Sequence, residues 1–171
     1  MTTPTATQRE FFEKYPMAIP SAGVLFFDTP DHERVLIVKP NGRTLWEIPG
    51  GVTEARAGET PVATARREIA EELGLDITVD RILGIDSVPE GPDHAPMIAF
   101  LYYGGVLTPT QLSSIRYVDH EIGDSRFAHP DELPGIMVPR LARRVAACAH
   151  HARTGKQTPL HLQHGTNPAI I

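Results

Sequence analysis

The sequence predicts an α/β fold, because segments with a β-strand pattern alternate along it with segments of helical pattern. The chain has 171 residues, which suits one domain with a sizeable core. Hydrophobic residues make up 41% and charged residues 22%, an ordinary globular mixture. Neither an internal repeat nor a low-complexity tract interrupts it. We therefore predict one domain at 21–154, with an N-terminal extension at 1–20 and an irregular C-terminal tail at 155–171.

The first half of the chain is predicted to be rich in strands. Residues 1–10 are polar and contain Thr and Pro, so we expect a frayed start. Strand patterns follow at 21–28 and 33–40, separated by the turn-rich sequence TPDH. A short strand at 44–51 ends abruptly at the sequence PGG, and the loop VTEARAG occupies 52–58.

A helix from about Pro61 to Leu73 has the clearest boundaries. Thr60 can cap its N-terminus, and Pro61 suits the first helical position. Gly74 can end the helix in the left-handed conformation. Apolar residues at helical spacing form a stripe that should face the core, namely Val62, Ala65, Ile69 and Leu73.

The second half continues the alternation. Strands are predicted at 76–88 and 97–107, with a loop at 89–96 between them. The segment 124–133 is predicted to be a last strand that runs into a turn, and 139–153 to be a closing helix. The tail beyond this helix carries Gly, Pro and polar breaks, which indicate irregular structure.

Composition and charge exclude several classes of protein. The formal net charge of −5 does not favour a nucleic acid polymer or an anionic membrane as partner. Cys148 is the single cysteine, which excludes an internal disulfide and fits a reducing compartment. The first residues lack a signal-peptide pattern, and no window approaches the ~20 apolar residues of a membrane span. We expect a soluble, cytoplasmic protein, with a homodimer left open as its assembly.

Three carboxylates fall on one side of the predicted helix, because Glu68, Glu71 and Glu72 are spaced i, i+3 and i+4. The like-charge pair Glu68 and Glu72 costs an isolated helix ~0.2–0.5 kcal/mol. No Lys or Arg follows any of the three at three or four positions to relieve it. Partly shielded carboxylates raise their pKa or recruit a cation. Most acidic helix faces are simply solvated, so the triplet alone leaves both interpretations open.

The surrounding sequence, from Pro49 to Leu75, resembles the signature of the Nudix hydrolases, G-x5-E-x7-R-E-U-x-E-E-x-G-U, where U is a bulky apolar residue. The order of predicted elements over 21–133 is similar to that family as well. The resemblance implies a Nudix fold, in which a mixed β-sheet is sandwiched between helices (an α/β/α sandwich). The matching positions are Glu59, Arg67, Glu68, Ile69, Glu71, Glu72, Gly74 and Leu75.

The loop before the helix departs from the signature. Thr53 stands where the family has a glycine, and Gly51 lies two residues earlier, so the loop carries a two-residue insertion. Such an insertion costs little loop entropy, and we expect the fold to survive it. In the family the backbone near this glycine helps to hold a metal ion. The insertion therefore leaves open where the Gly50 carbonyl points. Glu54 adds a carboxylate to the loop, and we expect it to be solvated.

The resemblance implies a metal-dependent hydrolase that cleaves a diphosphate linkage by attack of water on phosphorus. Carboxylates repel a polyanionic substrate, so divalent ions must stand between the two. Glutamate oxygens suit Mg²⁺ or Mn²⁺, and such ions can orient the diphosphate and acidify the attacking water. Metal would then neutralise the acidic helix face. The predicted metal ligands are Glu68, Glu71, Glu72 and the backbone of Gly50.

The remaining roles follow from the same resemblance. Arg67 lies on a different side of the helix from the carboxylates, and in the family the matching Arg pairs with the matching Glu, here Glu59. The general base stays open between Glu59, Glu68 and Glu71 of the motif and a fourth candidate. This is Glu121, which precedes the last predicted strand and fits a solvated loop residue equally well. The predicted catalytic residues are Glu59, Arg67, Glu68, Glu71, Glu72 and Glu121.

Other residues fit both a functional and a structural interpretation. Lys39 and Trp46 are candidate substrate-binding residues, although surface exposure of Lys39 and core packing of Trp46 are the simpler interpretations. The histidines in and after the closing helix match no zinc spacing. The basic sequence LARRVAAC at 141–148 is interpreted as a solvated helix face.

The substrate is predicted only as a class: a small-molecule diphosphate, either a nucleoside diphosphate linked to another moiety or a nucleoside triphosphate. Two alternatives stay open. One is a hydrolase of a non-nucleotide diphosphate, such as an isoprenoid or a cofactor precursor. The other is a non-catalytic Nudix-fold module that binds a ligand, although the retained glutamates favour catalysis.

Overall fold

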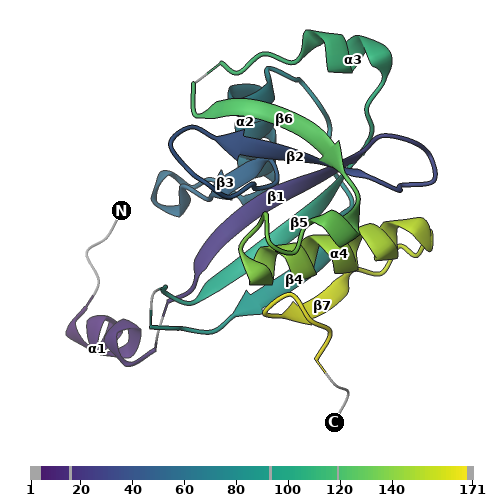
Figure 1. Ribbon diagram of the computed structural model, residues 1–171. Coiled ribbons are helices and arrows are strands. Elements are labelled where there is room, and N and C mark those ends of the chain that lie inside the picture. Colours follow the sequence, from purple (N-terminus) through teal and green to yellow (C-terminus); the bar gives the residue numbers. More distant parts are fainter. Residues whose placement is uncertain (1–4, 16, 93, 119, 169–171) are drawn as a thin grey trace.

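A computed structural model describes residues 5–15, 17–92, 94–118 and 120–168. A seven-stranded sheet runs through the molecule in the order β6-β2-β1-β5-β4-β7, and β3 pairs with β1 outside this path (Figure 1). The pairs β1–β5 and β4–β7 are parallel and the other pairs antiparallel, so the sheet is mixed. The strands are β1 (Ile19–Phe27), β2 (Val35–Pro40), β3 (Gly50–Val52), β4 (Ile82–Val88), β5 (Met97–Val106), β6 (Ile122–Ala128) and β7 (Leu160–Gln163).

Helices cover both faces of this sheet, with α2 (Pro61–Leu73) behind it and α4 (Pro139–Arg153) in front (Figure 1). Alternate residues of a strand point to opposite faces, and β1 supplies both cores in this way. Leu25 and Phe27 are fully buried in the core that includes α4, whereas Val24 and Phe26 are fully buried in the core that includes α2. The predicted α/β fold, with a mixed sheet between helices, is confirmed.

Helix α2 begins and ends where the sequence predicts. The Thr60 hydroxyl accepts a hydrogen bond from the Ala63 amide at 3.4 Å, and Gly74 ends the helix in the left-handed conformation, with φ 66°. The predicted apolar stripe packs on the sheet: Ala65, Ile69 and Leu73 are fully buried, and Val62 is partly buried.

Two predicted strands are longer than those observed. Of the segment 44–51, only the residues from Gly50 onward enter a strand, because Pro49 has no amide hydrogen to donate to a ladder. An isolated bridge between Val38 and Glu47 is what remains of pairing before Pro49. The segment 76–88 is in a strand only from Ile82. The residues before it bury apolar side chains in the α2 core, and Arg81 makes a single bond with β5, in which its carbonyl accepts from the Tyr103 amide at 2.8 Å.

The expectation of a frayed start is wrong for the described part of 1–10. The helix α1 (Ala6–Lys14) begins there, with Thr5 and Gln8 as its capping box. The short helix α3 (Pro109–Ser114) was not predicted either, and it also begins with a capping box. The two phenylalanines of α1 are adjacent and form no stripe at helical spacing, and α3 is short and polar, so only the capping boxes indicate these helices. Residues 1–4 and 16 of the predicted extension lie outside the described residues.

The tail predicted to be irregular contains a strand. Residues Leu160–Gln163 form β7, which pairs in parallel with β4 from Gly84 to Ser87. This strand has four residues, and its partner lies far away in the sequence, so no local pattern indicates it. The last part of the predicted tail, 169–171, is outside the described residues. Among the described helices, none has the length and apolar character needed to cross a bilayer.

The packing of α2 on the sheet predicts a large effect of truncating its stripe. Ile69→Ala should lower the free energy of unfolding by about 2–5 kcal/mol, because it empties a fully buried site. Arg66→Ala, at an exposed position of the same helix, should change it by no more than about 0.5 kcal/mol. Urea denaturation measures both. A loss below about 1 kcal/mol in Ile69→Ala would contradict the packing.

Candidate active site

A cleft of about 840 Å³ opens where β2 and β3 separate along β1. The first part of β1 pairs with β3 and its end pairs with β2, so the sheet parts between these two neighbours. Residues from both sides of the sheet reach the cleft. Its walls include Glu68 and Glu72 of α2, Glu121 before β6, and Arg140 and Arg144 of α4.

Two glycines bring the β3 backbone against the carboxylates of α2. The amide of Gly50 donates to Glu72 Oε2 at 2.9 Å, and Glu72 is only 7% exposed. A Cβ at Gly51 would lie 2.1 Å from Glu68 Oε1. A Cβ at Gly50, which has φ 142°, would lie 2.2 Å from the carbonyl oxygen of Ala22 in β1. The two glycines are therefore a steric requirement of this site.

The electrostatics of Glu68 fit a group that needs a cation. Burial raises the pKa of its carboxyl group above the ordinary glutamate value, and hydrogen bonding and charge from Arg67 oppose this rise. The charges of Glu71 and Glu121 raise the pKa further. Glu68 therefore lies in a partly desolvated environment with carboxylates nearby.

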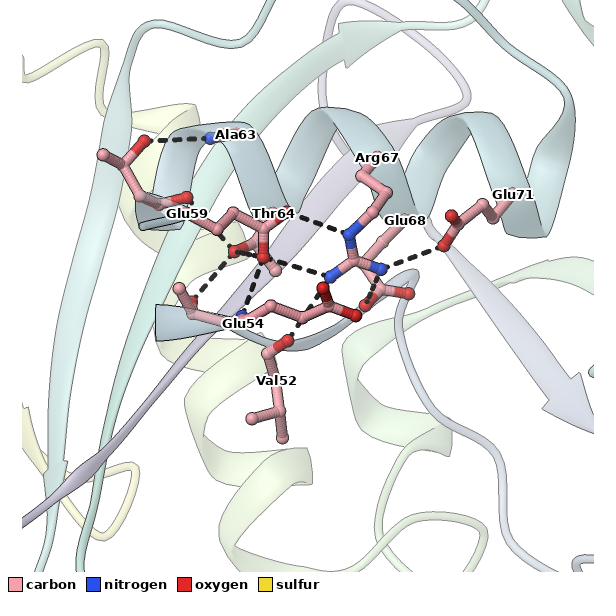
Figure 2. A network of polar contacts seen from close by, with 10 residues as sticks. Val52, Glu54, Glu59, Ala63, Thr64, Arg67, Glu68 and Glu71 are labelled. Atoms are coloured by element: carbon pink, nitrogen blue, oxygen red, sulfur yellow. Dashed lines mark hydrogen bonds and ion pairs between the residues drawn. The ribbon is translucent and has the colours of Figure 1, made fainter. Parts of the chain in front are cut away.

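Arg67 lies among three carboxylates (Figure 2). Its Nε donates to Glu59 Oε1 at 2.9 Å, so the predicted pair is present. Its Nη1 lies 2.9 Å from both Glu68 Oε1 and Glu71 Oε2. The expectation that Arg67 lies away from the acidic side of the helix is therefore wrong for its guanidinium group. The long side chain of Arg carries the charge well beyond the position of its Cα.

Glu59 ties the inserted loop to α2. Besides two bonds from Arg67, its Oε2 is hydrogen-bonded to the Thr64 hydroxyl at 2.9 Å and to the Glu54 amide at 2.8 Å (Figure 2). Hydrogen bonding from Arg67, and then from the Glu54 amide, lowers the pKa of Glu59 to about 2. Thr53 is buried and its hydroxyl bonds to that of Thr64 at 2.9 Å. These hydrogen bonds favour the charged form of Glu59 and hold the loop against α2.

The extra residues of the loop bulge outward. They form a single 3-10 turn at Ala55–Ala57, and Gly58 closes it with φ 82°. Glu54 is exposed, as predicted. The insertion is thereby accommodated between β3 and α2, while the glycines on one side and Glu59 on the other keep their contacts with α2.

Asn41 anchors the loop that carries Glu121. Its side-chain amide donates to the His120 carbonyl at 2.8 Å, and its backbone amide donates to the Glu121 carbonyl at 2.7 Å. Gly123 leaves room for this contact, because a Cβ there would lie 2.2 Å from Asn41 Oδ1. This anchoring role was missed, because the dipeptide Asn41-Gly42 is typical of a turn and does not indicate a contact with a distant loop. Glu121 lines the cleft.

Five predicted site residues are not among those that line the cleft; Glu59 and Arg67, described above, are two of them. The amino group of Lys39 bonds to the Thr44 carbonyl and lies 5.6 Å from the centre of the Trp46 ring. Trp46 packs against the core that includes α4. Glu71, with a side chain 46% exposed, reaches Arg67 and is not among the residues that line the cleft.

The prediction of a solvated basic face on the closing helix is wrong for one of its arginines. Arg143 is exposed, but Arg144 is only 7% exposed and donates from Nε to Asp86 Oδ2 at 2.7 Å. Arg140 is half-buried and lines the cleft with Arg144. The i, i+4 spacing of Arg140 and Arg144 was a signal that they share one side of the helix.

The donors around the acidic wall suit a hard divalent cation in their chemistry. Glu68, Glu72 and Glu121 offer carboxylate oxygens, and Gly51, having no Cβ, leaves space beside Glu68. Across the described ranges, no three His, Cys, Asp or Glu side chains are already gathered as a formed metal site. Arg67 engages Glu68 in this arrangement, so an ion would have to replace that contact.

Comparisons with known proteins relate the chain to a family and to individual proteins. A family model described as NUDIX domain matches residues 17–148. The chain is 26% identical over 115 residues to a putative 8-oxo-dGTP diphosphatase of Bacillus subtilis, covering 67% of this chain and 70% of that protein. It is 42% identical over 55 residues to an ADP-ribose pyrophosphatase of Mycobacterium tuberculosis, covering 32% of this chain and 26% of that protein.

Solved structures support the fold in the same way. The MutT protein of Methanosarcina mazei Go1 superposes with a TM-score of 0.61 at 19% identity, covering 82% of this chain and 97% of that one. At this level of identity the likeness concerns the fold alone.

The contacts of Arg67 predict a change in stability with a defined pH dependence. Arg67→Ala should lower the melting temperature at neutral pH, because Glu59 loses its partner, and Arg67→Lys should recover this only in part, since Lys lacks the planar fork. The pKa of Glu59 is lower in the folded protein than its ordinary value of 4.5. The ion pair therefore stabilises the folded state fully at pH values above 4.5. The difference in melting temperature between the parent and Arg67→Ala should therefore become smaller as the pH falls from 4.5 toward 2.

Melting curves of the parent and both variants across this pH range test the prediction. Arg66→Ala is the matched control, an exposed neighbour on the same helix, and its melting temperature should follow the parent's at every pH. An Arg67→Ala protein as stable as the parent at neutral pH would show that the ion pair does not hold the loop.

Proposed function

Since the chain belongs to the NUDIX domain family and is a pyrophosphohydrolase acting on acid anhydrides, we propose that it cleaves the diphosphate linkage of a nucleotide by metal-dependent attack of water on phosphorus. The substrate class is a nucleoside diphosphate linked to another moiety, or a nucleoside triphosphate. One observation carries this proposal: Glu68, Glu72 and Glu121 all line the cleft beside the backbone of Gly50.

Members of this family typically depend on divalent metal ions, and we propose Mg²⁺ or Mn²⁺ here. Glu68, Glu72 and the Gly50 carbonyl would hold the ion, with Glu71 and Glu121 within the same acidic region. When bound, the ion supplies the charge that lowers the pKa of the attacking water and neutralises the diphosphate. The raised pKa of Glu68 supports this assignment, because a cation favours the charged form of a partly buried carboxylate.

We propose that Glu121 accepts the proton of the attacking water. Glu121 lines the cleft, and its charge raises the pKa of Glu68, so the two carboxylates are electrostatically close. Glu59 is a weaker candidate, since its pKa is held at about 2, and Glu71 is engaged with Arg67. Asn41 orients Glu121 through the backbone bonds on either side of it. Arg67 and Glu59 act by positioning the loop and the helix.

The relatives support a nucleotide as substrate. Two of the similar proteins are named for 8-oxo-dGTP and for ADP-ribose, and both compounds contain a nucleoside attached to a di- or triphosphate. The cleft has room for more than a diphosphate, and apolar side chains of β5 contribute to its walls. A panel of nucleoside triphosphates and nucleoside diphosphate sugars, followed by released phosphate or monophosphate, tests the substrate class.

Removal of metal should abolish hydrolysis. We expect no turnover in EDTA and full recovery on adding excess Mg²⁺ or Mn²⁺, because the carboxylates cannot stabilise a polyanionic substrate themselves. Metal that binds the native state also raises the melting temperature by mass action, and Glu68→Gln should lose most of that rise. Full activity in EDTA would exclude the mechanism.

Substitution of Glu72 should affect stability and rate in opposite directions. Without metal, Glu72→Gln keeps an acceptor for the Gly50 amide and removes a like charge, so stability should stay level or rise by about 0.2–0.5 kcal/mol. With Mg²⁺, turnover should fall at least about a hundredfold, roughly 2.7 kcal/mol of barrier. Calorimetric melting and steady-state kinetics measure the two effects.

Glu54→Gln is the control for this experiment, because Glu54 is an exposed carboxylate of the neighbouring loop. Its turnover should stay near the parental value. Near-parental turnover in Glu72→Gln would remove Glu72 from the set of metal ligands.

A further inference from the structure

Two arginines form part of the cleft wall contributed by α4. Arg140 and Arg144 are spaced i, i+4, so they project from one side of the helix, and both line the cleft. They come from the helix that covers the opposite face of the sheet from α2, which carries Glu68 and Glu72. The chemistry proposed for the glutamates gives these two arginines no role.

Arg144 is held in place by buried contacts. Its partner Asp86 in β4 is fully buried and also accepts from the Gly165 amide at 3.1 Å through Oδ1. Gly165 follows β7 and has φ 76°, and a Cβ there would lie 2.4 Å from the Arg140 carbonyl. The turn after β7 therefore packs closely on α4, and it fixes the carboxylate that orients Arg144.

Arg144 retains hydrogen-bonding capacity beyond this pair. Its Nη2 is buried and has no hydrogen-bond partner among the described residues. A buried donor without a partner is costly. Arg140 forms no ion pair with the described parts of the chain. Asp86 thus balances one of two guanidinium groups, and this wall presents surplus positive charge to the cleft.

Apolar side chains line the cleft along with the two charged groups. They include Met97, Ala99 and Leu101 of β5, Val138 directly before α4, and Leu141 in α4. Such a lining suits the uncharged part of a bound molecule, while the few polar groups fix its orientation. The cleft is therefore acidic where α2 meets it, apolar along β5 and basic at α4.

We propose that Arg140 and Arg144 bind a second anionic group of the substrate, a carboxylate or a phosphate carried away from the scissile diphosphate. This inference rests on the proposed function, because a diphosphate held at the glutamates directs the rest of the substrate along the cleft. Guanidinium groups bind carboxylates and phosphates through paired hydrogen bonds. The substrate class is then a nucleoside diphosphate derivative that carries an additional acidic group.

Matched compounds test this specificity. UDP-glucuronate and UDP-glucose differ by a carboxylate on the sugar, and 2′-phospho-ADP-ribose and ADP-ribose differ by a phosphate. With Mg²⁺, we expect kcat/KM to favour the acidic member of at least one pair by about tenfold or more, the effect of about 1.4 kcal/mol. The pair that shows the preference identifies the anion.

Variants then assign the preference to the arginines. Arg140→Gln should bring the ratio of acidic to neutral substrate toward one. Arg144→Lys keeps a charge for Asp86, so the protein folds, but it lacks the planar fork and should also lower the ratio. Arg143→Gln is the matched control: Arg143 is exposed, bonds to the His164 carbonyl, and is not among the cleft-lining residues. Its ratio should equal the parental one.

The outcomes separate this inference from the proposed function. A parent that hydrolyses no member of the two pairs counts against the proposed function, and calorimetric titration with the same four compounds in Mg²⁺ then decides the inference through the ratio of Kd values. The inference is overturned when neither acidic compound is preferred. It is also overturned when the preference persists unchanged in both Arg140→Gln and Arg144→Lys.

Discussion

The close approach of the Gly50–Gly51 backbone to its neighbours is the constraint on which the candidate site depends. On one side it leaves no room for a side chain next to β1, and on the other it leaves none next to Glu68. The same backbone donates to Glu72, so the acidic side of α2 is fixed relative to the sheet. The apolar stripe of α2 packs on the sheet and fixes the distance between the helix and the sheet. The two glycines fix the position of the helix carboxylates at the edge of the cleft.

Arg67 explains how the chain folds with so many carboxylates in one place. It bonds to Glu59, Glu68 and Glu71, and so provides an internal counterion for the acidic side of α2. Partial charge balance of this kind lowers the cost of bringing carboxylates together. It does not remove the burial that raises the pKa of Glu68. The fold therefore tolerates the cluster while leaving Glu68 better suited to a cation than an exposed glutamate would be.

The sequence predicted most of what depends on local pattern. Helix α2 shows its stripe, cap and terminal glycine in consecutive residues, and both ends were predicted correctly. The strand β7 and the partner of Arg144 were not, because each depends on a residue far away in the chain. The contacts of Arg67 with Glu68 and Glu71 were missed for a different reason. The position of a residue in a helix fixes the direction in which its side chain leaves the backbone. The charged end of a long, flexible side chain can lie on another side of the helix.

The two walls of the cleft differ in what fixes them. Most of the glutamate wall, with Gly50, Glu68 and Glu72, lies in the contiguous segment from β3 through α2, and this is why one sequence motif describes it; Glu121 joins it from the segment before β6. The arginine wall needs α4, the buried Asp86 of β4 and the Gly165 turn after β7, three segments that only the folded sheet brings together. The arginine wall can therefore change without a change in the glutamates that carry the proposed chemistry. The residues that discriminate between substrates are therefore expected where no short motif can report them.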